Sequence, residues 1–158
     1  MVVGLPQAAL GHWEFTEWGM SPEQVARASH GQATPTSPEE RVQRRIVNEG
    51  WAPQLKSAWQ SGPFRFAAYF YFEGANALAL VVLNLEEGDP RSWIGALKAT
   101  HGDPVSESAT WSLPEAEGGC GGDAMCVTEM GVWHTPTDEV RYLHIRALRE
   151  VRVFYRPR

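Results

Sequence analysis

The sequence predicts an α+β fold in which an antiparallel β-sheet, made of a hairpin and about four further strands, carries two or three helices packed on one face. Three observations predict it. Residues 64–85 form two apolar runs joined by Gly74-Ala75-Asn76, helix-capping patterns precede and follow these runs, and the last third of the chain holds several short strand-like segments. Because strands so close in sequence pair most simply with their neighbours, we expect an antiparallel sheet.

Length and composition suit one folded domain. The chain has 158 residues, 43% hydrophobic residues, seven Trp and only 21% charged residues. Disorder requires lower hydrophobicity and higher net charge, and this length is enough to bury a sizeable core. We therefore expect a flexible leader over residues 1–11 and a single α+β domain over residues 12–158.

Charge and hydropathy exclude two classes of partner. The net charge is -5, the wrong sign for a protein that grips phosphate backbones, so we expect no nucleic-acid partner. The arginines of the last eighteen residues alternate with strand-forming apolar residues, and we interpret them as a solvated sheet face. No uninterrupted apolar run is long enough to predict a membrane-spanning segment. The first residues also lack the pattern of a secretory signal.

The first elements are predicted by alternation and by capping patterns. Residues 12–18 alternate apolar and polar side chains, as in a short strand or extended segment. Residues 21–24 (SPEQ) form a capping box with Pro at the first helical position, which predicts a helix ending near His30-Gly31. Residues 37–40 (SPEE) repeat the pattern and predict a second helix to about Asn48. Residues 32–36 between these helices are interpreted as a loop, and residues 51–62 as a region that can include a strand.

The hairpin at residues 64–85 is the centre of the predicted sheet. One phase of its first strand is wholly apolar and requires cover: Phe64, Phe66, Ala68, Phe70 and Phe72. In its second strand both phases are apolar. Either both faces are covered, or a β-bulge switches the phase, and the pattern leaves both possibilities open.

The rest of the chain predicts one helix and then about four strands. Asp89 is suited to an N-cap and Pro90 to the first helical position, so a helix is expected to about His101. Its inward stripe is formed by Trp93, Ile94, Leu97 and Thr100. Strands are predicted at residues 105–113, 126–134, 140–148 and 151–155, with turn chemistry at residues 136–139.

Several of these segments resemble a known fold. They are residues 18–25 (WGMSPEQV), the Leu-rich end of the hairpin, the helix that closes in residues 101–104 (HGDP), and the final residues 153–155 (VFY). Together they resemble the beta-lactamase-inhibitor-protein-like fold of small bacterial envelope proteins, which the outer-membrane-assembly lipoproteins also use. The likeness spans roughly residues 13–157, and the chain departs from the lipoproteins in lacking a lipobox Cys near its start.

The resemblance implies a helix pair packed on an antiparallel sheet and a role in binding other proteins. It carries over no site residues. It also implies a periplasmic or otherwise extracytoplasmic location, with the cytoplasm as the alternative.

Cys120 and Cys126 lie close together in a Gly-rich loop. A disulfide between them would contribute about 2 kcal/mol by chain-entropy arithmetic, and two such neighbouring cysteines fit an oxidising compartment. Two alternatives stay open. The cysteines can be reduced thiols of a cytosolic protein, or they can supply two of the four ligands that a metal site requires.

The chain shows no catalytic or cofactor-binding motif. H-E-x-x-H, G-x-S-x-G, P-loop and G-x-G-x-x-G patterns are all missing from the sequence, and the five His show no ligand spacing. We therefore expect no enzymatic activity, no cofactor and no metal. An enzyme of an unrecognised type stays open as a further hypothesis.

The seven Trp suggest a binding surface. Five of them are candidate interface aromatics: Trp13, Trp18, Trp51, Trp59 and Trp133. If several share an exposed sheet face with tyrosines, they form a surface of the kind that anchors protein interfaces; the alternative is that loops cover them. The leading hypothesis is a binding or assembly module that contacts a protein partner. The alternative is a small-molecule or lipid carrier with a pocket between helices and sheet.

Overall fold

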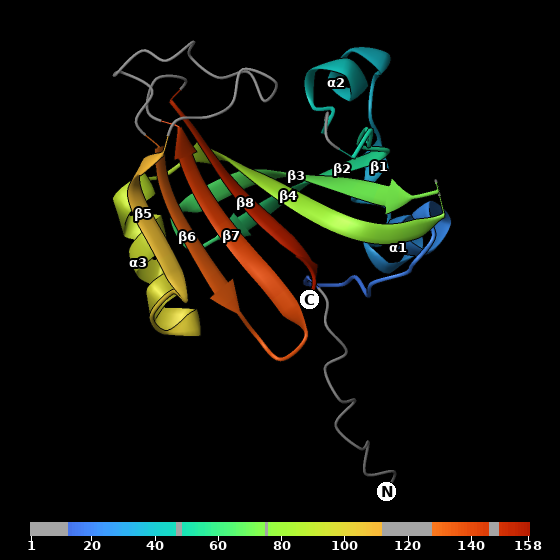
Figure 1. Cartoon of the computed structure of the whole chain (residues 1–158). Coiled ribbons are helices and arrows are strands. Elements are labelled where there is room, and N and C mark those ends of the chain that lie inside the picture. The colour runs from blue at the N-terminus through green and yellow to red at the C-terminus, as the bar shows by residue number, and fades with distance from the viewer. Residues whose placement is uncertain (1–12, 47–48, 75, 112–127, 146–148) are drawn as a thin grey trace, which may run out of the picture.

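The protein folds around one antiparallel sheet of eight strands (Figure 1). The structure is a computed structural model and describes residues 13–46, 49–74, 76–111, 128–145 and 149–158. The strands are β1 (Thr34–Pro35), β2 (Leu55–Ser61), β3 (Phe64–Glu73), β4 (Ala77–Glu87), β5 (Ser106–Trp111), β6 (Thr128–His134), β7 (Asp138–Ile145) and β8 (Glu150–Pro157). The helices are α1 (Pro22–Ala28), α2 (Pro38–Gln43) and α3 (Pro90–His101). The α+β class and the antiparallel sheet are thus confirmed, but the sheet has two strands more than the predicted hairpin and four, because β1 and β2 extend it beyond β3.

The sheet consists of two four-stranded meanders joined at its centre. Its strand order is β1-β2-β3-β4-β8-β7-β6-β5, so strands that follow each other in sequence are neighbours within each half. The halves meet where β4 pairs with β8, with Val82 opposite Phe154 and Asn84 opposite Arg152. Helix α3 carries the chain from β4 at the centre to β5 at the far edge.

The β3–β4 hairpin contains a bulge and is buried on both faces. Tyr71 lies opposite Leu80 and Phe72 opposite Leu78, so Ala79 is the extra residue that shifts the phase. On one face Phe70 has no exposed surface, and on the other Tyr71 is only 2% exposed. Both possibilities that the sequence left open are therefore realised.

Helices α1 and α3 lie on the same side of the sheet, at opposite ends (Figure 1). Val25 of α1 and Trp93 and Leu97 of α3 are buried in the main core. Trp93 lies at the centre of an aromatic cluster, with ring centroids 4.7 Å from Phe66 and 5.0 Å from Phe64. Both helices begin where the sequence predicts, at the Ser21 capping box and at the Asp89 N-cap.

Helix α2 and the residues after it lie against the other face. The Tyr71 hydroxyl donates to the Arg44 carbonyl oxygen at 2.7 Å, and Ile46 and Trp51 pack on the Tyr69–Tyr71 side of the hairpin. This helix buries no residue of its own, and Val42 is 77% exposed. It ends at Gln43, earlier than the predicted Asn48, because its apolar stripe is too thin to hold a longer helix on the sheet.

Two short segments differ from the prediction. Residues 13–20 form turns and no strand, because the Thr16 N–H and hydroxyl both donate to the Trp13 carbonyl oxygen and close a turn there. Thr34 and Pro35, expected in a loop, form the edge strand β1, paired with Lys56 and Leu55. In the first segment this turn overrides the alternation of residues 12–18, and the two residues of β1 are too few to show a period.

Candidate functional site

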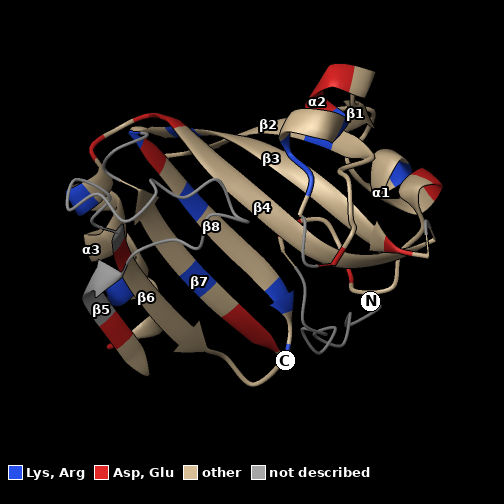
Figure 2. Ribbon diagram, turned by 45° about the horizontal axis from the view of Figure 1, so that its top comes forward, with Lys and Arg blue, Asp and Glu red and all other residues tan. Residues whose placement is uncertain are grey.

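Strands β7 and β8 present three arginines on the sheet face opposite α1 and α3. Cross-strand partners share a face, and Arg141 lies opposite Phe154 while Arg156 lies opposite Glu139. The same face includes Asn84 of β4, opposite Arg152. We call this surface the arginine face and define it as Asn84, Met130, Glu139, Arg141, Glu150, Arg152, Phe154 and Arg156. Figure 2 shows the basic bands of β7 and β8 lying near the acidic residues of the same strands.

Carboxylates organise the arginine face. The Glu139 carboxylate forms ion pairs with Arg141 at 3.0 Å and with Arg156 at 2.9 Å, and it lies 3.5 Å from His134 Nε2. Arg152 pairs with Glu150 at 2.5 Å. Burial raises the pKa of Glu139, but Arg156 and Arg141 outweigh this and hold the pKa below its ordinary value. Glu139 is therefore ionised at neutral pH.

The arginines remain accessible even though they are paired. Their side chains are 40% exposed at Arg141, 31% at Arg152 and 43% at Arg156. Three guanidinium groups pair with two carboxylates, so the arginine face carries a net positive charge. The whole chain, in contrast, has a net charge of -5. A partner can therefore reach the cationic groups without breaking the sheet.

A small cleft of about 40 Å³ lies where the segment after α2 approaches the arginine face. Arg44 and Arg45 line it from that segment, and Asn84, Arg152 and Phe154 line it from the sheet. The side-chain oxygen of Asn84 and Nε of Arg141 are buried and have no hydrogen-bond partner within the described parts of the chain. An unpaired acceptor and an unpaired donor thus lie on the same face.

The five candidate tryptophans do not share one exposed face. Trp13 is 4% exposed and Trp133 is 1% exposed, so these two are core residues. Trp59 and Trp18 are half-buried and pack against the same core. Only Trp51 lies on the other face, half-buried beside Tyr69 and Tyr71.

Hydrogen bonds hold two of these tryptophans in place. The Trp133 indole donates to the Gly102 carbonyl oxygen at 2.9 Å, and its ring covers Gly131, where an added Cβ would lie 2.8 Å from it. The Trp18 indole donates to the Asp138 carboxylate at 2.6 Å. The tyrosines considered with them, Tyr69, Tyr71 and Tyr142, are buried as well.

The other predicted features are located as follows. Cys120 and Cys126 lie outside the described residues. Among the residues that the structure describes, no group of three or more His, Cys, Asp or Glu could hold a metal ion. Within the same residues, no helix is both long enough and apolar enough to cross a membrane.

Sequence reasoning assigned the arginines to a sheet face but did not identify the site. The alternation at positions 152, 154 and 156 already indicates one face of one strand. What the sequence does not show is the pairing of β8 with both β4 and β7, which brings Asn84 and Arg141 to Arg152 and Phe154.

Comparison of the chain with protein-family models, with curated proteins and with solved structures finds no match.

Proposed function

We propose that the protein is a non-enzymatic binding or assembly module whose arginine face contacts an acidic segment of a partner protein. The observation that carries the proposal is the alignment of Arg141, Arg152 and Arg156 around Phe154 on paired strands. Charge complementarity between such a surface and an acidic partner directs encounter and fixes orientation. Arginine and aromatic side chains are also the residues that most often dominate binding energy at protein interfaces.

The composition of the face favours a protein partner over a nucleic acid. Glu139 and Glu150 lie among the arginines. Their carboxylates would repel the phosphates of a nucleic-acid backbone that ran along this face. Phe154 and Met130 add apolar surface at the centre. Mixed charges around an apolar centre match the anatomy of protein interfaces, in which a polar rim surrounds a core containing aromatics and Met.

The accessible part of Arg141 indicates what the partner brings. Its side chain is 40% exposed, whereas its Nε and the Asn84 side-chain oxygen are buried and out of reach of a partner. A partner carboxylate binds the exposed terminal nitrogens of Arg141 through charge-assisted hydrogen bonds, which an aliphatic segment cannot supply.

The place of action is part of the proposal. The resemblance of residues 18–25 and of the element order to small bacterial envelope proteins supports a periplasmic or otherwise extracytoplasmic module with a protein partner. It names no partner.

The test is a peptide titration that is monitored by two-dimensional NMR. A short synthetic peptide that alternates Glu with Leu is added to the protein, and a Lys-Leu peptide serves as the charge control. Signals of Arg141, Arg152 and Phe154 should shift with the acidic peptide only, and the shift should diminish as salt is added. The double variant Arg141→Ser, Arg152→Ser should bind about tenfold more weakly or worse, a loss of about 1.4 kcal/mol or more.

The matched control is Arg27→Ser combined with Arg91→Ser. These two arginines are exposed and lie on the helices of the opposite face, so the control removes the same charge from the molecule. Equal loss of binding in both double variants would show a general charge effect. That result, or shifts confined to other strands, would refute the proposal.

A further inference from the structure

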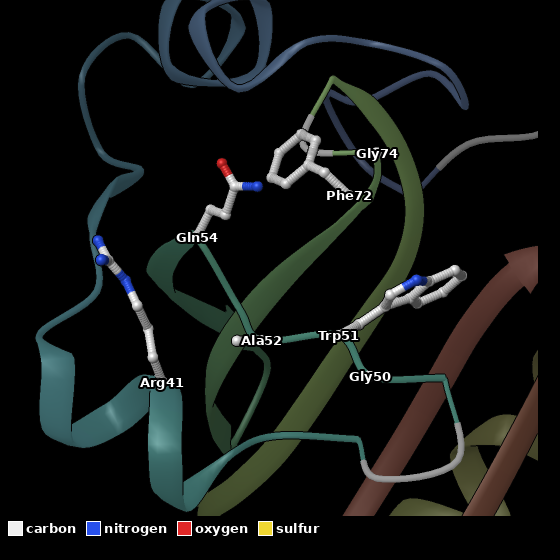
Figure 3. A pocket seen from close by; sticks show the side chains of 7 residues that line it. All are labelled: Arg41, Gly50, Trp51, Ala52, Gln54, Phe72 and Gly74. Atoms are coloured by element: carbon white, nitrogen blue, oxygen red, sulfur yellow. The ribbon is translucent and has the colours of Figure 1, made fainter.

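We propose that a second site, at the turn end of the β3–β4 hairpin, binds a small carboxylate with a flat apolar body. A pocket of about 490 Å³ opens there between the hairpin, α2 and the residues that lead into β2. Figure 3 shows Gln54 between Arg41 and Phe72, with Gly74 beside Phe72, and Trp51 also lines the pocket. Its volume lies within the range of about 300–1,000 Å³ typical of small-molecule sites.

Arg41 provides the cation. Its Nε donates to the Thr36 hydroxyl oxygen at 3.1 Å, and that hydroxyl donates to the Pro53 carbonyl oxygen at 2.6 Å. These two bonds fix the guanidinium at the pocket wall. The terminal nitrogens of Arg41 have no ion pair within the described part of the chain, so the planar fork is available to a carboxylate.

The neighbouring charged groups are engaged elsewhere. Glu40, next to Arg41 on α2, forms an ion pair with Lys56. The Arg44 guanidinium lies over the Tyr69 ring, 5.2 Å from its centroid, and lines the cleft on the other side of this segment. Arg41 is therefore the cation that this pocket presents.

Gln54 provides a second polar contact. Its backbone N–H donates to the Phe70 carbonyl oxygen at 3.0 Å, and its own carbonyl oxygen accepts from the Thr36 N–H at 3.1 Å. The backbone is thus held from both sides. Among the described residues, the side-chain amide has no hydrogen bond, and in Figure 3 it lies between Arg41 and Phe72. It can donate to an oxygen bound at Arg41.

Aromatic side chains form the apolar part of the site. Phe72 is 4% exposed and belongs to the main core, so its ring is a rigid wall. Trp51 is positioned by its carbonyl oxygen, which accepts the Ile46 N–H at 2.8 Å. Because Phe72 and Trp51 lie on opposite faces of the hairpin, a flat ring packs against one of them, and Phe72 is the ring that lies next to Gln54 in Figure 3.

One guanidinium favours a carboxylate over a phosphate. A carboxylate carries a single charge and matches the arginine fork with two parallel hydrogen bonds. A phosphate monoester carries about two charges at neutral pH and is usually held by several cations or by a helix N-terminus. The pocket offers Arg41 alone as a cation from the residues that line it.

The experiment uses cinnamate as the probe and cinnamamide as its neutral counterpart. Each compound is titrated into the full-length protein while NMR records the Arg41 Nε–H, the Gln54 side-chain amide and the Trp51 indole N–H. Cinnamate should shift all three signals in a saturable way, and cinnamamide should bind about tenfold more weakly.

Two variants test the roles of the lining residues. Arg41→Gln should reduce cinnamate affinity about tenfold, whereas Arg27→Gln, on the last turn of α1, should leave it unchanged. Gln54→Leu leaves the Arg41–Thr36 bond intact and should also weaken binding, which keeps the test decisive if the first variant fails to fold. No saturable shift, equal binding of the amide, or equal loss in Arg27→Gln would overturn the proposal.

Discussion

Trp18 fastens the segment before α1 to the turn between β6 and β7. Its indole Nε1 donates to Asp138 Oδ1 at 2.6 Å, and the acceptor is a charged group in a half-buried place. The same segment is hydrogen-bonded to the start of β4. The Gly19 N–H donates to the Leu78 carbonyl oxygen, and the Leu78 N–H donates to the Met20 carbonyl oxygen. One side chain therefore links residues from both ends of the chain.

We predict that Trp18→Phe lowers the free energy of unfolding by about 1–3 kcal/mol, because it keeps an aromatic ring but removes a hydrogen bond to a charged group. Urea unfolding measures the change. Trp51→Phe is the control, since the Trp51 indole has no hydrogen bond to the described residues. If both variants lose the same free energy, the loss comes from ring size, and the role given to the indole N–H is wrong.

Glu139 makes the arginine face sensitive to acid. Its pKa in the folded state lies below the ordinary value of 4.5, because Arg156 and Arg141 outweigh the opposing effect of burial. A depressed pKa stabilises the fold above the unfolded-state pKa, and this stabilisation is lost as the pH falls through the folded-state pKa. Between these two pKa values the folded carboxylate is still ionised while the unfolded one gains a proton.

We predict that Glu139→Gln destabilises the protein at neutral pH. The difference in unfolding free energy from the parent should shrink as the pH falls below the ordinary pKa of 4.5 and through the folded-state pKa. Chemical unfolding at several pH values provides the measurement. Glu17→Gln, at an exposed position without an ion pair among the described residues, should show no such pH dependence. If the difference in unfolding free energy between Glu139→Gln and the parent stays constant with pH, the ionised Glu139 carboxylate is not the source of the stabilisation.

At the scale of elements, caps decide where the helices begin. The Asp89 carboxylate accepts from the Ser92 N–H at 2.9 Å and from the Ser92 hydroxyl at 2.8 Å. Helix α3 spans twelve residues but buries only Trp93 and Leu97. Its first turn therefore depends on this cap more than on packing.

We predict that Asp89→Ala costs about 1 kcal/mol of stability, the usual effect of losing an N-cap side chain. Hydrogen exchange should show faster opening of the first turn of α3. Asp103→Ala, just beyond the end of the helix at an exposed position, removes the same charge without a cap and should be close to neutral. Equal destabilisation by the two variants would argue against the cap.

The sequence predicted the elements whose signal is local. Capping boxes located α1 and α2, the Asp89-Pro90 pair located α3, and the period-2 pattern located β3. The strand β1 was not predicted, because Thr34 pairs with Lys56, which is distant in sequence. The end of α2 was predicted too late, because the helix buries no residue of its own and its thin apolar stripe does not extend it beyond Gln43.

The same reason explains what was missed at the candidate site. The positions of Arg152 and Phe154 within β8 follow from alternation, but their neighbours follow from the order of the strands. Pairing of β4 with β8 joins residues from the two halves of the chain, and no short-range pattern reports it. The aromatic candidates failed to gather on a surface because Trp13 and Trp133 are large enough to fill the core.

At the scale of the whole molecule, the pairing of β4 with β8 joins the two meanders, and we call this junction the β4–β8 seam. Leu83 and Val153 lie opposite each other across it, and neither has any exposed surface. The main core contains residues from both meanders and from α1 and α3. Such a continuous core favours one cooperative unfolding transition.

We predict that Leu83→Ala lowers stability by about 2–5 kcal/mol, as expected for a truncated buried Leu. Tryptophan fluorescence and hydrogen exchange in β6 and β7 should report the same unfolding midpoint in the parent protein. Val42→Ala, at a highly exposed position on α2, is the control and should change little. Separate midpoints for the two halves would show that the seam does not couple them.

The central claim is that the arginine face contacts a partner protein. The most direct measurement is site-specific photo-crosslinking in cells that naturally produce the protein, with a photoreactive phenylalanine analogue at Phe154. The control places the analogue at Ala99, an exposed position on α3 on the opposite side of the sheet.

The account predicts a crosslink from position 154 to a protein with an acidic segment at the crosslinked site. This crosslink should disappear when Arg141 and Arg152 are replaced by Ser and should be missing from position 99. A crosslink that survives the loss of both arginines, or that forms equally from Ala99, would contradict the claim.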